Sequence, residues 1–230
     1  MTTHAFTLVY ENDYFIVINK STNINFHDEG EINQGVFNQV KASLGYTNLF
    51  PVHRIDKITS GLLIFAKDIA TANQFGLLFK QHNIDKYYLA ISADKPRKKQ
   101  GWIKGDMVKS RRSSYKLMRS MNNPALSQFH SYPIKPNLRL FLVRPLTGKT
   151  HQIRVALKSV GAAIVGDPIY NPQSSADRGY LHAYGLRFEL NHQQYEFICP
   201  PNQGAMFELT QTQQVIESLP KPWLINWPKK

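Results

Sequence analysis

The side chains best suited to chemistry gather in one short stretch, which reads His-Arg-Ile-Asp-Lys-Ile-Thr-Ser-Gly over residues 53–61. Asp56 is its only carboxylate, and it stands between Arg54 and Lys57. A neighbouring cation favours the ionised form of a carboxylate, which is the form that acts as a nucleophile or a base. A structural alternative stays open on these residues alone, because Asp56 is equally suited to a turn or to a surface pair with Arg54.

The residues after this loop predict the strand that carries it. Positions 62–66 are all apolar and lie between Gly61 and Lys67. A run this short predicts a strand buried on both faces. The polar loop is therefore expected at the mouth of a central sheet, where binding and catalytic residues concentrate.

Periodicity predicts more strands than helices. Further strands are expected at residues 7–10, 14–18, 86–91, 129–134, 138–144, 181–188 and 195–199. Helices are expected at residues 36–44 before Gly45, from the cap Asp68 to Asn83, and from the cap Thr150 to Gly161. Because several strands are joined by short turns, we predict an α+β fold with a mixed, mainly antiparallel central sheet and flanking helices.

Composition predicts a single domain over residues 1–230, with room for two lobes. Hydrophobic residues make up 42% of the chain, yet no apolar stretch approaches the roughly 20 residues of a membrane span. No signal sequence is recognisable, so we expect a cytoplasmic protein. Cys199 is the only cysteine, which excludes an intramolecular disulfide. The eight His residues show no paired ligand spacing, so no metal site is expected.

Positive charge is concentrated in one segment. The formal net charge is +12, and residues 95–119 hold ten Lys or Arg against Asp106 alone, a net +9. Such a concentration indicates a polyanionic partner, and Trp102 and Tyr115 within it suit stacking on the bases of single-stranded or looped RNA. The alternative is a solvated hairpin whose charge serves only solubility.

Four stretches together resemble the RluA-type pseudouridine synthases, whose signature is His-Arg-Leu-Asp-x-x-Thr-Ser-Gly-Leu. Residues 53–62 match this signature with Ile55 in place of Leu. The other stretches are Gly-Lys-Thr-His-Gln-Ile-Arg-Val at 148–155, Val-Gly-Asp-Pro-Ile-Tyr at 165–170 and Leu-His-Ala at 181–183. The resemblance extends from about residue 8 to about residue 200 and implies the pseudouridine synthase fold.

This resemblance implies the roles of three residues. Asp56 takes the position of the catalytic carboxylate, and Arg154 that of its salt-bridge partner. Tyr88 takes the position of the active-site Tyr, because residues 86–90 resemble the family's Lys-x-Tyr-x-Ala motif. Without the family, Tyr88 would be read as a sheet residue and Arg154 as a solvated helix residue. Asp167 precedes a Pro and is expected to form a turn.

The implied activity is isomerisation of a specific uridine in ribosomal or transfer RNA to pseudouridine, by a monomer without a cofactor. The expected partner is a structured RNA stem-loop, and the separate N-terminal RNA-binding domain of many relatives is not expected. The residues expected to contact RNA are Arg54, Thr59, Arg97, Lys98, Lys99, Arg111, Arg112, Lys149, His151 and Gln152. Departures from the family pattern are Ser21 for Pro, Asn23 for Gly, and Lys149 for Arg, which lacks the bidentate fork of Arg.

Two other classes stay open at this point. A glycoside hydrolase needs a pair of carboxylates, whereas Asp56 has no second one in its motif. A non-catalytic RNA-binding module would keep the basic segment at 95–119 without bringing Asp56, Tyr88 and Arg154 together. Convergence of these three residues therefore separates an enzyme from a binding module.

Overall fold

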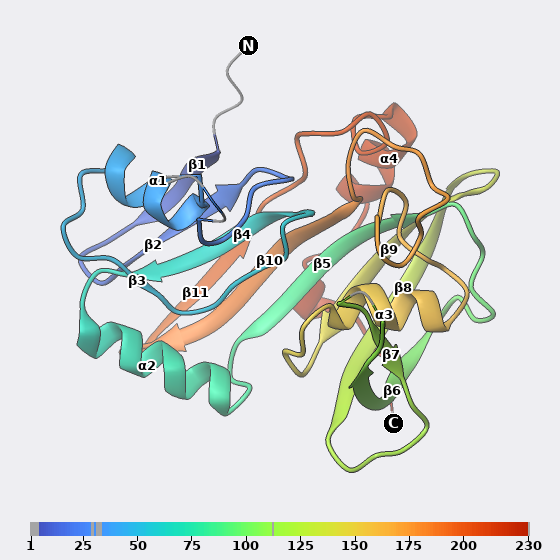
Figure 1. Ribbon diagram of the computed structural model, residues 1–230, viewed down its shortest axis with the longest axis horizontal. Coiled ribbons are helices and arrows are strands. Elements are labelled where there is room, and N and C mark those ends of the chain that lie inside the picture. Colours follow the sequence, from blue (N-terminus) through green and yellow to red (C-terminus); the bar gives the residue numbers. More distant parts are fainter. Residues whose placement is uncertain (1–4, 29, 31–33, 112, 230) are drawn as a thin grey trace.

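The computed structural model describes residues 5–28, 30, 34–111 and 113–229, and they form one long sheet with helices on it (Figure 1). The strands are β1 (Phe6–Glu11), β2 (Phe15–Lys20), β3 (Phe50–Pro51), β4 (Thr59–Ala66), β5 (Asp85–Ser92), β6 (Gln100–Lys109), β7 (Tyr115–Leu117), β8 (Pro124–Lys135), β9 (Leu138–Pro145), β10 (Leu181–Leu190) and β11 (Gln193–Ile198). The helices are α1 (Val36–Ser43), α2 (Ile69–Lys80), α3 (Gln152–Ser159), α4 (Thr210–Glu217) and the short 3-10 helix η1 (Pro222–Leu224).

The strand order explains how distant segments meet. It runs β1-β2-β4-β10-β5-β9-β8-β6-β7, with β3 beside β4 and β11 beside β10. Within the described residues, β4 and β10 pair in parallel and the other strand pairs are antiparallel. The predicted α+β fold with a mainly antiparallel sheet is therefore confirmed.

β4 is buried along its whole length, as predicted. It begins earlier than the sequence suggests, because Thr59 already pairs with Leu181 of β10. Gly61 then has a φ of +105°, and a Cβ there would lie 2.3 Å from the carbonyl oxygen of Ala183. Only glycine permits this close approach, which draws the loop before β4 against β10.

Local signals mark several element ends, and those at Asp68 and Gly45 were predicted correctly. Asn12 closes the β1–β2 turn, where its Oδ1 accepts two backbone N–H groups at 2.9 Å each. Asp68 caps α2 by accepting the N–H of Thr71 at 2.7 Å. Gly45 follows α1 with a φ of +69°. Each of these signals acts over a few residues, so each is legible without knowing the tertiary structure.

The start of α3 corrects the prediction that Thr150 is its cap. The helix begins at Gln152, and the N-cap is His151, with φ 58° and ψ 18°. The carbonyl of His151 accepts a helical hydrogen bond from the N–H of Val155 at 3.0 Å. The chain therefore enters the helix through a left-handed residue, a conformation that is uncommon for a side chain such as His.

The two faces of the sheet have different covers. α3 packs against β6, β7, β8 and β9, and Figure 1 shows it in front of the sheet. On the opposite face, Tyr87 stacks on Trp227 with ring centroids 5.9 Å apart. Because successive residues of a strand point to opposite faces, Lys86 and Tyr88 share the front face. The C-terminal segment thus supports from behind the strand that carries Tyr88.

Candidate active site

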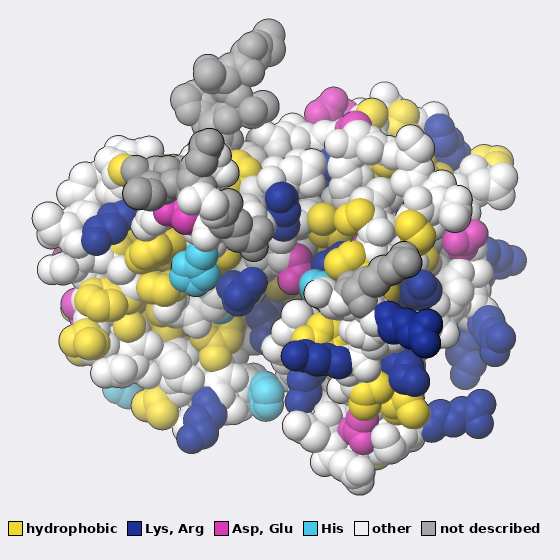
Figure 2. Space-filling model, in the orientation of Figure 1, with side chains coloured by type: hydrophobic (Ala, Val, Ile, Leu, Met, Phe, Trp, Pro, Cys, Tyr) yellow, Lys and Arg dark blue, Asp and Glu magenta, His cyan; other side chains and the backbone are white. Residues whose placement is uncertain are grey.

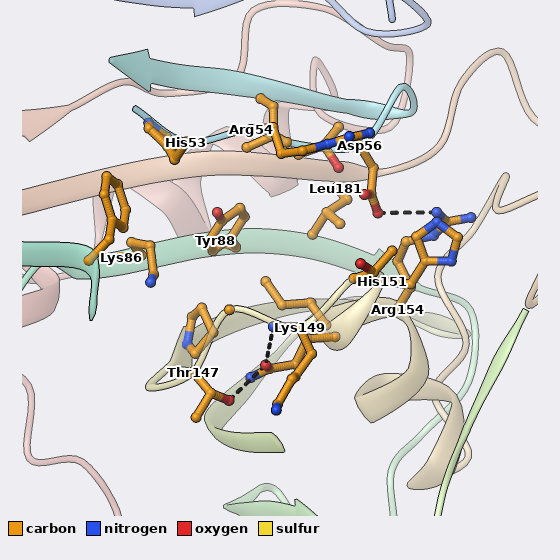
Figure 3. A pocket seen from close by; sticks show the side chains of 18 of the residues that line it. His53, Arg54, Asp56, Lys86, Tyr88, Thr147, Lys149, His151, Arg154 and Leu181 are labelled. Atoms are coloured by element: carbon orange, nitrogen blue, oxygen red, sulfur yellow. Dashed lines mark hydrogen bonds and ion pairs between the residues drawn. The ribbon is translucent and has the colours of Figure 1, made fainter. Parts of the chain in front are cut away.

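A cavity of about 510 Å³ opens on the front of the sheet, beside the start of β4 (Figure 3). Residues 52–56 form one wall, and Pro145, residues 147–151 and the first turn of α3 form the other. Lys86 and Tyr88 of β5 and Leu181 of β10 line the space between them. This volume lies within the range of pockets that hold small organic ligands.

Arg154 joins two carboxylates at one end of the cavity. Its Nη1 donates to Asp56 Oδ2 at 3.1 Å, and its Nε and Nη2 donate to Asp167 at 2.7 and 2.8 Å. Burial disfavours the guanidinium charge, but the hydrogen bonds and charges of Asp167 and Asp56 outweigh it and raise the pKa of Arg154. Arg154 is therefore a fixed cation that contacts Asp56 directly.

One carboxylate oxygen of Asp56 is available to a ligand in the cavity. Its side chain is 24% exposed, against 3% for Arg154. Oδ2 accepts from Arg154, whereas Oδ1 has no hydrogen-bond partner within the part of the chain that the structure describes. Among the described residues that line the cavity, Asp56 is also the only carboxylate. The site therefore offers a single acidic group.

Asp167 both forms a turn and holds Arg154. Its Oδ1 accepts the N–H groups of Ile169 and Tyr170 at 2.9 and 3.0 Å, so the predicted turn is confirmed. Its side chain is fully buried, and although burial opposes its charge, the hydrogen bonds from Arg154 lower the pKa of Asp167. Sequence reasoning missed this second role, for which the only signal was that Asp167 lies in one of the four stretches of the resemblance.

Tyr88 lies between Lys86 and Asp56 along the cavity (Figure 3). Burial and the negative charge of Asp56 raise the pKa of its phenol well above the ordinary value, so the phenol is neutral near pH 7. Its hydroxyl has no partner among the described residues. A neutral aromatic ring with a free hydroxyl can stack on a base and form a hydrogen bond to a neighbouring polar group.

A buried lysine anchors the loop that carries Asp56. Lys20 is fully buried, and its Nζ donates to two carbonyls of its own segment at 2.8 Å each and to the carbonyl of Lys57 at 3.4 Å. Burial and the charge of Arg178 lower the pKa of Lys20 to about 7, against the attraction of Asp56. Thr22 donates to the next carbonyl of the loop at 2.9 Å. The segment that departs from the family pattern at Ser21 therefore still positions the Asp56 loop.

A second buried network lies behind Ser60. Arg178 donates to Ser60 Oγ at 2.7 Å, and the same hydroxyl lies 2.7 Å from His182 Nδ1. His182 Nε2 lies 2.7 Å from the carbonyl oxygen of Cys199, so Nε2 carries the proton and Nδ1 accepts from Ser60. This network joins β4 to β10. Its partners are far apart in the sequence, which is why local patterns did not reveal it.

Five of the residues predicted to contact RNA line the cavity, namely Arg54, Thr59, Lys149, His151 and Gln152. Arg54 is exposed, and its guanidinium has no partner in the described part of the chain. Lys149 Nζ donates to Asn123 Oδ1 at 2.7 Å. His151 Nδ1 lies 2.9 Å from the hydroxyl of Tyr170.

The side chain of Gln152 is bound within the protein. Its Oε1 accepts from Thr147 Oγ1 at 2.7 Å and from the N–H of Lys149 at 3.0 Å. Its Nε2 donates to the carbonyl of Leu126 and to Ser127 Oγ, both at 3.0 Å. Both ends of the amide are therefore occupied, so Gln152 holds the loop before α3, and its contact with RNA stays a prediction.

The basic segment lies outside the cavity lining. Arg97, Lys98 and Lys99 are exposed between β5 and β6, Arg111 is exposed after β6, and Arg112 lies outside the described residues. Figure 2 shows Lys and Arg side chains gathered over the part of the molecule that carries α3, β6 and β7. Tyr115 links this region to the site, because its N–H donates to the hydroxyl of Tyr170 at 2.9 Å and its ring lies 5.8 Å from that of His151.

Two further observations concern the described residues as a set. They contain no cluster of three His, Cys, Asp or Glu side chains arranged to bind a metal. Their helices include none with the length and apolar character that crossing a membrane requires.

Comparisons with known proteins agree with the geometry. Residues 14–159 match the family described as RNA pseudouridylate synthase. An uncharacterized RNA pseudouridine synthase of Haemophilus influenzae is 45% identical over 219 residues, which cover 94% of this chain and 97% of that protein. Ribosomal large subunit pseudouridine synthase C of Rickettsia bellii is 36% identical over 168 residues, which cover 71% of this chain and 56% of that longer protein.

Solved structures show the same fold. Human RNA pseudouridylate synthase domain containing 1 aligns with a TM-score of 0.73 and 22% identity over 94% of this chain and 96% of that chain. Human RNA pseudouridylate synthase domain containing 4 aligns with a TM-score of 0.71 and 21% identity over 90% and 92%. The family match over more than half of the sequence, together with the relative from Haemophilus influenzae that is 45% identical, establishes that the chain belongs to the RNA pseudouridine synthases and is an isomerase.

Proposed function

We propose that this protein converts a specific uridine of ribosomal or transfer RNA to pseudouridine, as a monomer, with Asp56 as the catalytic carboxylate. The observation that supports the proposal most is the meeting of Asp56, Tyr88 and Arg154 at one cavity, with Asp56 Oδ2 3.1 Å from Arg154 Nη1. These residues lie on separate elements, and a module that only binds RNA has no need to bring them together.

The reaction breaks the bond from N1 of uracil to C1′, turns the base and forms the bond from C5 to C1′. C5 then loses its proton and N1 gains one, so the product is an isomer of the substrate. Asp56 acts by attacking C1′, through an ester bond that breaks when C5 bonds to C1′, or by removing the 2′ proton and later returning it, and its free Oδ1 is compatible with both routes. Arg154 fixes the other oxygen, and Tyr88 stacks on the base. The target nucleotide must leave its stack, at a cost of about a few kcal/mol that is least in loops. Arg54 fills the position that the base vacates.

Glycoside hydrolysis is the second candidate, and the surroundings of Asp167 disfavour it. A hydrolase needs a second carboxyl group beside the substrate. Asp167 is the carboxylate that shares Arg154 with Asp56, but its side chain is 0% exposed and pairs with Arg154 through both oxygens. It is therefore unable to protonate a leaving group in the cavity.

Ribosomal RNA is the better supported target. The Rickettsia relative is named for the ribosomal large subunit, and its alignment covers 71% of this chain at 36% identity. Because this chain spans only 56% of that protein, the ribosomal target is carried over as part of the proposal. Mapping new pseudouridines in separate ribosomal and transfer RNA fractions after incubation with the protein decides between the two.

The role of Asp56 is tested by Asp56→Asn, which keeps the shape of the side chain and removes its charge. We expect RNA affinity close to wild type and turnover below about 1% of wild type, a loss above roughly 2.7 kcal/mol of transition-state stabilisation. Asp13→Asn, in the exposed β1–β2 turn, is the matched control and should keep full activity. Turnover of Asp56→Asn above that level would remove Asp56 from the proposed role.

A further inference from the structure

Lys86 lines the end of the cavity away from Arg154 (Figure 3). It lies two residues before Tyr88 on β5, so the two side chains share one face with their Cα atoms about 7 Å apart. The neighbouring lining residues are largely apolar or aromatic and include Val52, His53 and Phe79. The ammonium of Lys86 lies 5.5 Å from the centroid of the Phe79 ring.

The ammonium of Lys86 is the partly buried cation of this cavity that lacks an anionic or hydrogen-bonding partner among the described residues. The adjacent carboxylate, Asp85, pairs with Arg144 at 2.8 Å. The other Lys and Arg side chains that line the cavity differ from Lys86. Arg154 pairs with two carboxylates, Lys149 donates a hydrogen bond to Asn123, and Arg54 is exposed to solvent.

A cation in such a place favours an anionic occupant. Removing an ammonium from water without a compensating hydrogen bond or charge is unfavourable, and the contact with one aromatic ring offsets this only in part. Burial accordingly lowers the pKa of Lys86, with Asp85 opposing the shift. A phosphate oxygen at this position would complete the hydrogen bonding of the ammonium.

We propose that Lys86 binds the phosphate that joins the target uridine to a neighbouring nucleotide. The inference rests on the proposed function, because it takes the uracil to lie against Tyr88 with its C1′ at Asp56. Both phosphates of that nucleotide are bonded to its ribose, so the proposal takes the RNA backbone to run from Asp56 along β5, which brings one phosphate to Lys86, one side-chain position beyond Tyr88. Lys86 and the Asp56–Arg154 pair thus hold the target nucleotide from opposite ends of the cavity, which fixes the direction in which the RNA strand crosses the site.

Lys86→Met tests this contact, because it keeps the aliphatic stem over Phe79 and removes the charge. Lys80→Met, exposed in the last turn of α2 and outside the cavity lining, is the matched control. Pseudouridine formation is measured over a series of salt concentrations. We expect Lys86→Met to lower kcat/KM by about 10- to 100-fold, mainly through KM, and to flatten its log–log salt dependence by roughly 0.7. Lys80→Met should match wild type.

A second measurement identifies the partner on the RNA. A methylphosphonate replaces, one at a time, the phosphates on the two sides of the target uridine and removes the charge of each. At one of the two phosphates, we expect the methylphosphonate to lower the kcat/KM of wild type by about the same factor as Lys86→Met lowers it on unmodified RNA. The same methylphosphonate should not lower the kcat/KM of Lys86→Met any further. Equal losses in both proteins at both phosphates, as a contact to a base would give, overturn the proposal.

Other outcomes also test the proposed contact between Lys86 and a phosphate. An unchanged kcat/KM and salt slope in a folded Lys86→Met overturns the inference. If Lys86→Met does not unfold cooperatively, Lys86→Gln takes its place. Full activity of wild type on RNA in which both phosphates are methylphosphonates would overturn the inference without any variant. Failure of wild type to form pseudouridine in any RNA fraction contradicts the proposed function instead, so the two failures are distinguishable.

Discussion

At the scale of single residues, the site depends on buried cations with different kinds of partner. Arg154 has two carboxylates, whereas the hydrogen bonds of Arg178 go to Ser60 and to backbone carbonyls in the described part of the chain. Burial lowers the pKa of Arg178 to about 10, against the influence of nearby acidic groups. Both guanidinium groups donate in several fixed directions at once, which a lysine does not reproduce. The Asp56 loop is thus held by directional hydrogen bonds as well as by apolar packing.

The neutral ring of His182 predicts a loss of stability in mild acid. Burial lowers the pKa of His182 from 6.5 to about 3, so between these values the unfolded chain binds a proton that the native protein does not. The free energy of unfolding is therefore highest above about pH 6.5 and falls as the pH drops towards 3, by up to about 1.4 kcal/mol per pH unit for this residue. His53 acts in the same direction, because burial and the charge of Lys86 lower its pKa to about 3.

Urea unfolding between about pH 4.5 and 7.5 measures this effect. We expect His182→Gln to be less stable than wild type near pH 7.5, because it disturbs the hydrogen bonds to Ser60 and Cys199, but to show a shallower pH dependence. His192→Gln, at an exposed ring in the β10–β11 turn, is the control and should follow wild type. Identical pH slopes for wild type and His182→Gln contradict the assignment.

At the scale of elements, the molecule separates the cavity from its basic surface. Arg97, Lys98 and Lys99 lie in the β5–β6 turn, outside the lining of the cavity. The β6–β7 hairpin packs against α3, the helix that carries Arg154. Cations on these elements are therefore suited to hold RNA beside the target, while we expect the cavity to hold the target nucleotide itself.

Replacing Arg97, Lys98 and Lys99 by Gln tests this division of labour. If these residues contact phosphates, RNA binding should weaken, and the log–log salt slope of the affinity should flatten by roughly 0.7 for each lost contact with single-stranded RNA. The single-turnover rate constant at saturating RNA should stay near that of wild type. The control replaces Lys80, Lys135 and Lys229, which removes the same charge elsewhere. Equal effects of the two triple variants would mean that only net charge matters and that the segment is a solvated hairpin.

At the scale of the whole molecule, one face of the sheet is open to substrate and part of the other is closed by the C-terminal segment. Trp102 Nε1 and Gln128 Nε2 both donate to the carbonyl of Pro228, at 2.7 and 2.8 Å. Pro228 follows Trp227, which stacks on Tyr87 behind the strand that carries Tyr88. We therefore expect RNA to bind from the front, where the cavity lies.

A single front-facing site predicts recognition of a local RNA feature. We expect an isolated stem-loop of about 15 to 20 nucleotides, the reach of small RNA-binding modules, to be modified nearly as well as the intact RNA. The measurement compares kcat/KM on the fragment with that on the full-length RNA. A loss above about a hundredfold, roughly 2.7 kcal/mol, would show that distant RNA structure or another protein supplies the recognition.

The sequence predicted what local physics determines and missed what tertiary pairing determines. The cap Asp68 and the wholly buried strand after Gly61 follow from neighbouring residues, and the structure confirms both. The cap at Thr150 was wrong because a left-handed His151 is set by its surroundings. The network of Arg178, Ser60 and His182 spans more than a hundred residues, so no periodicity revealed it. The roles of Asp56, Tyr88 and Arg154 came from the family resemblance, and they stay predictions until the variants are measured.

The parallel pairing of β4 with β10 determines when, during synthesis of the chain, the Asp56 loop meets its partner strand. Ser60 reaches Arg178 and His182 across 118 and 122 residues of chain. At about 5–20 residues per second, a ribosome needs roughly 6 to 24 seconds to make that stretch. Throughout this interval the nascent chain carries the Asp56 motif without the strand that clamps it. The Asp56 motif therefore acquires these partners only after residue 182 has been made, and fragments released before that point carry the motif without its contacts to β10.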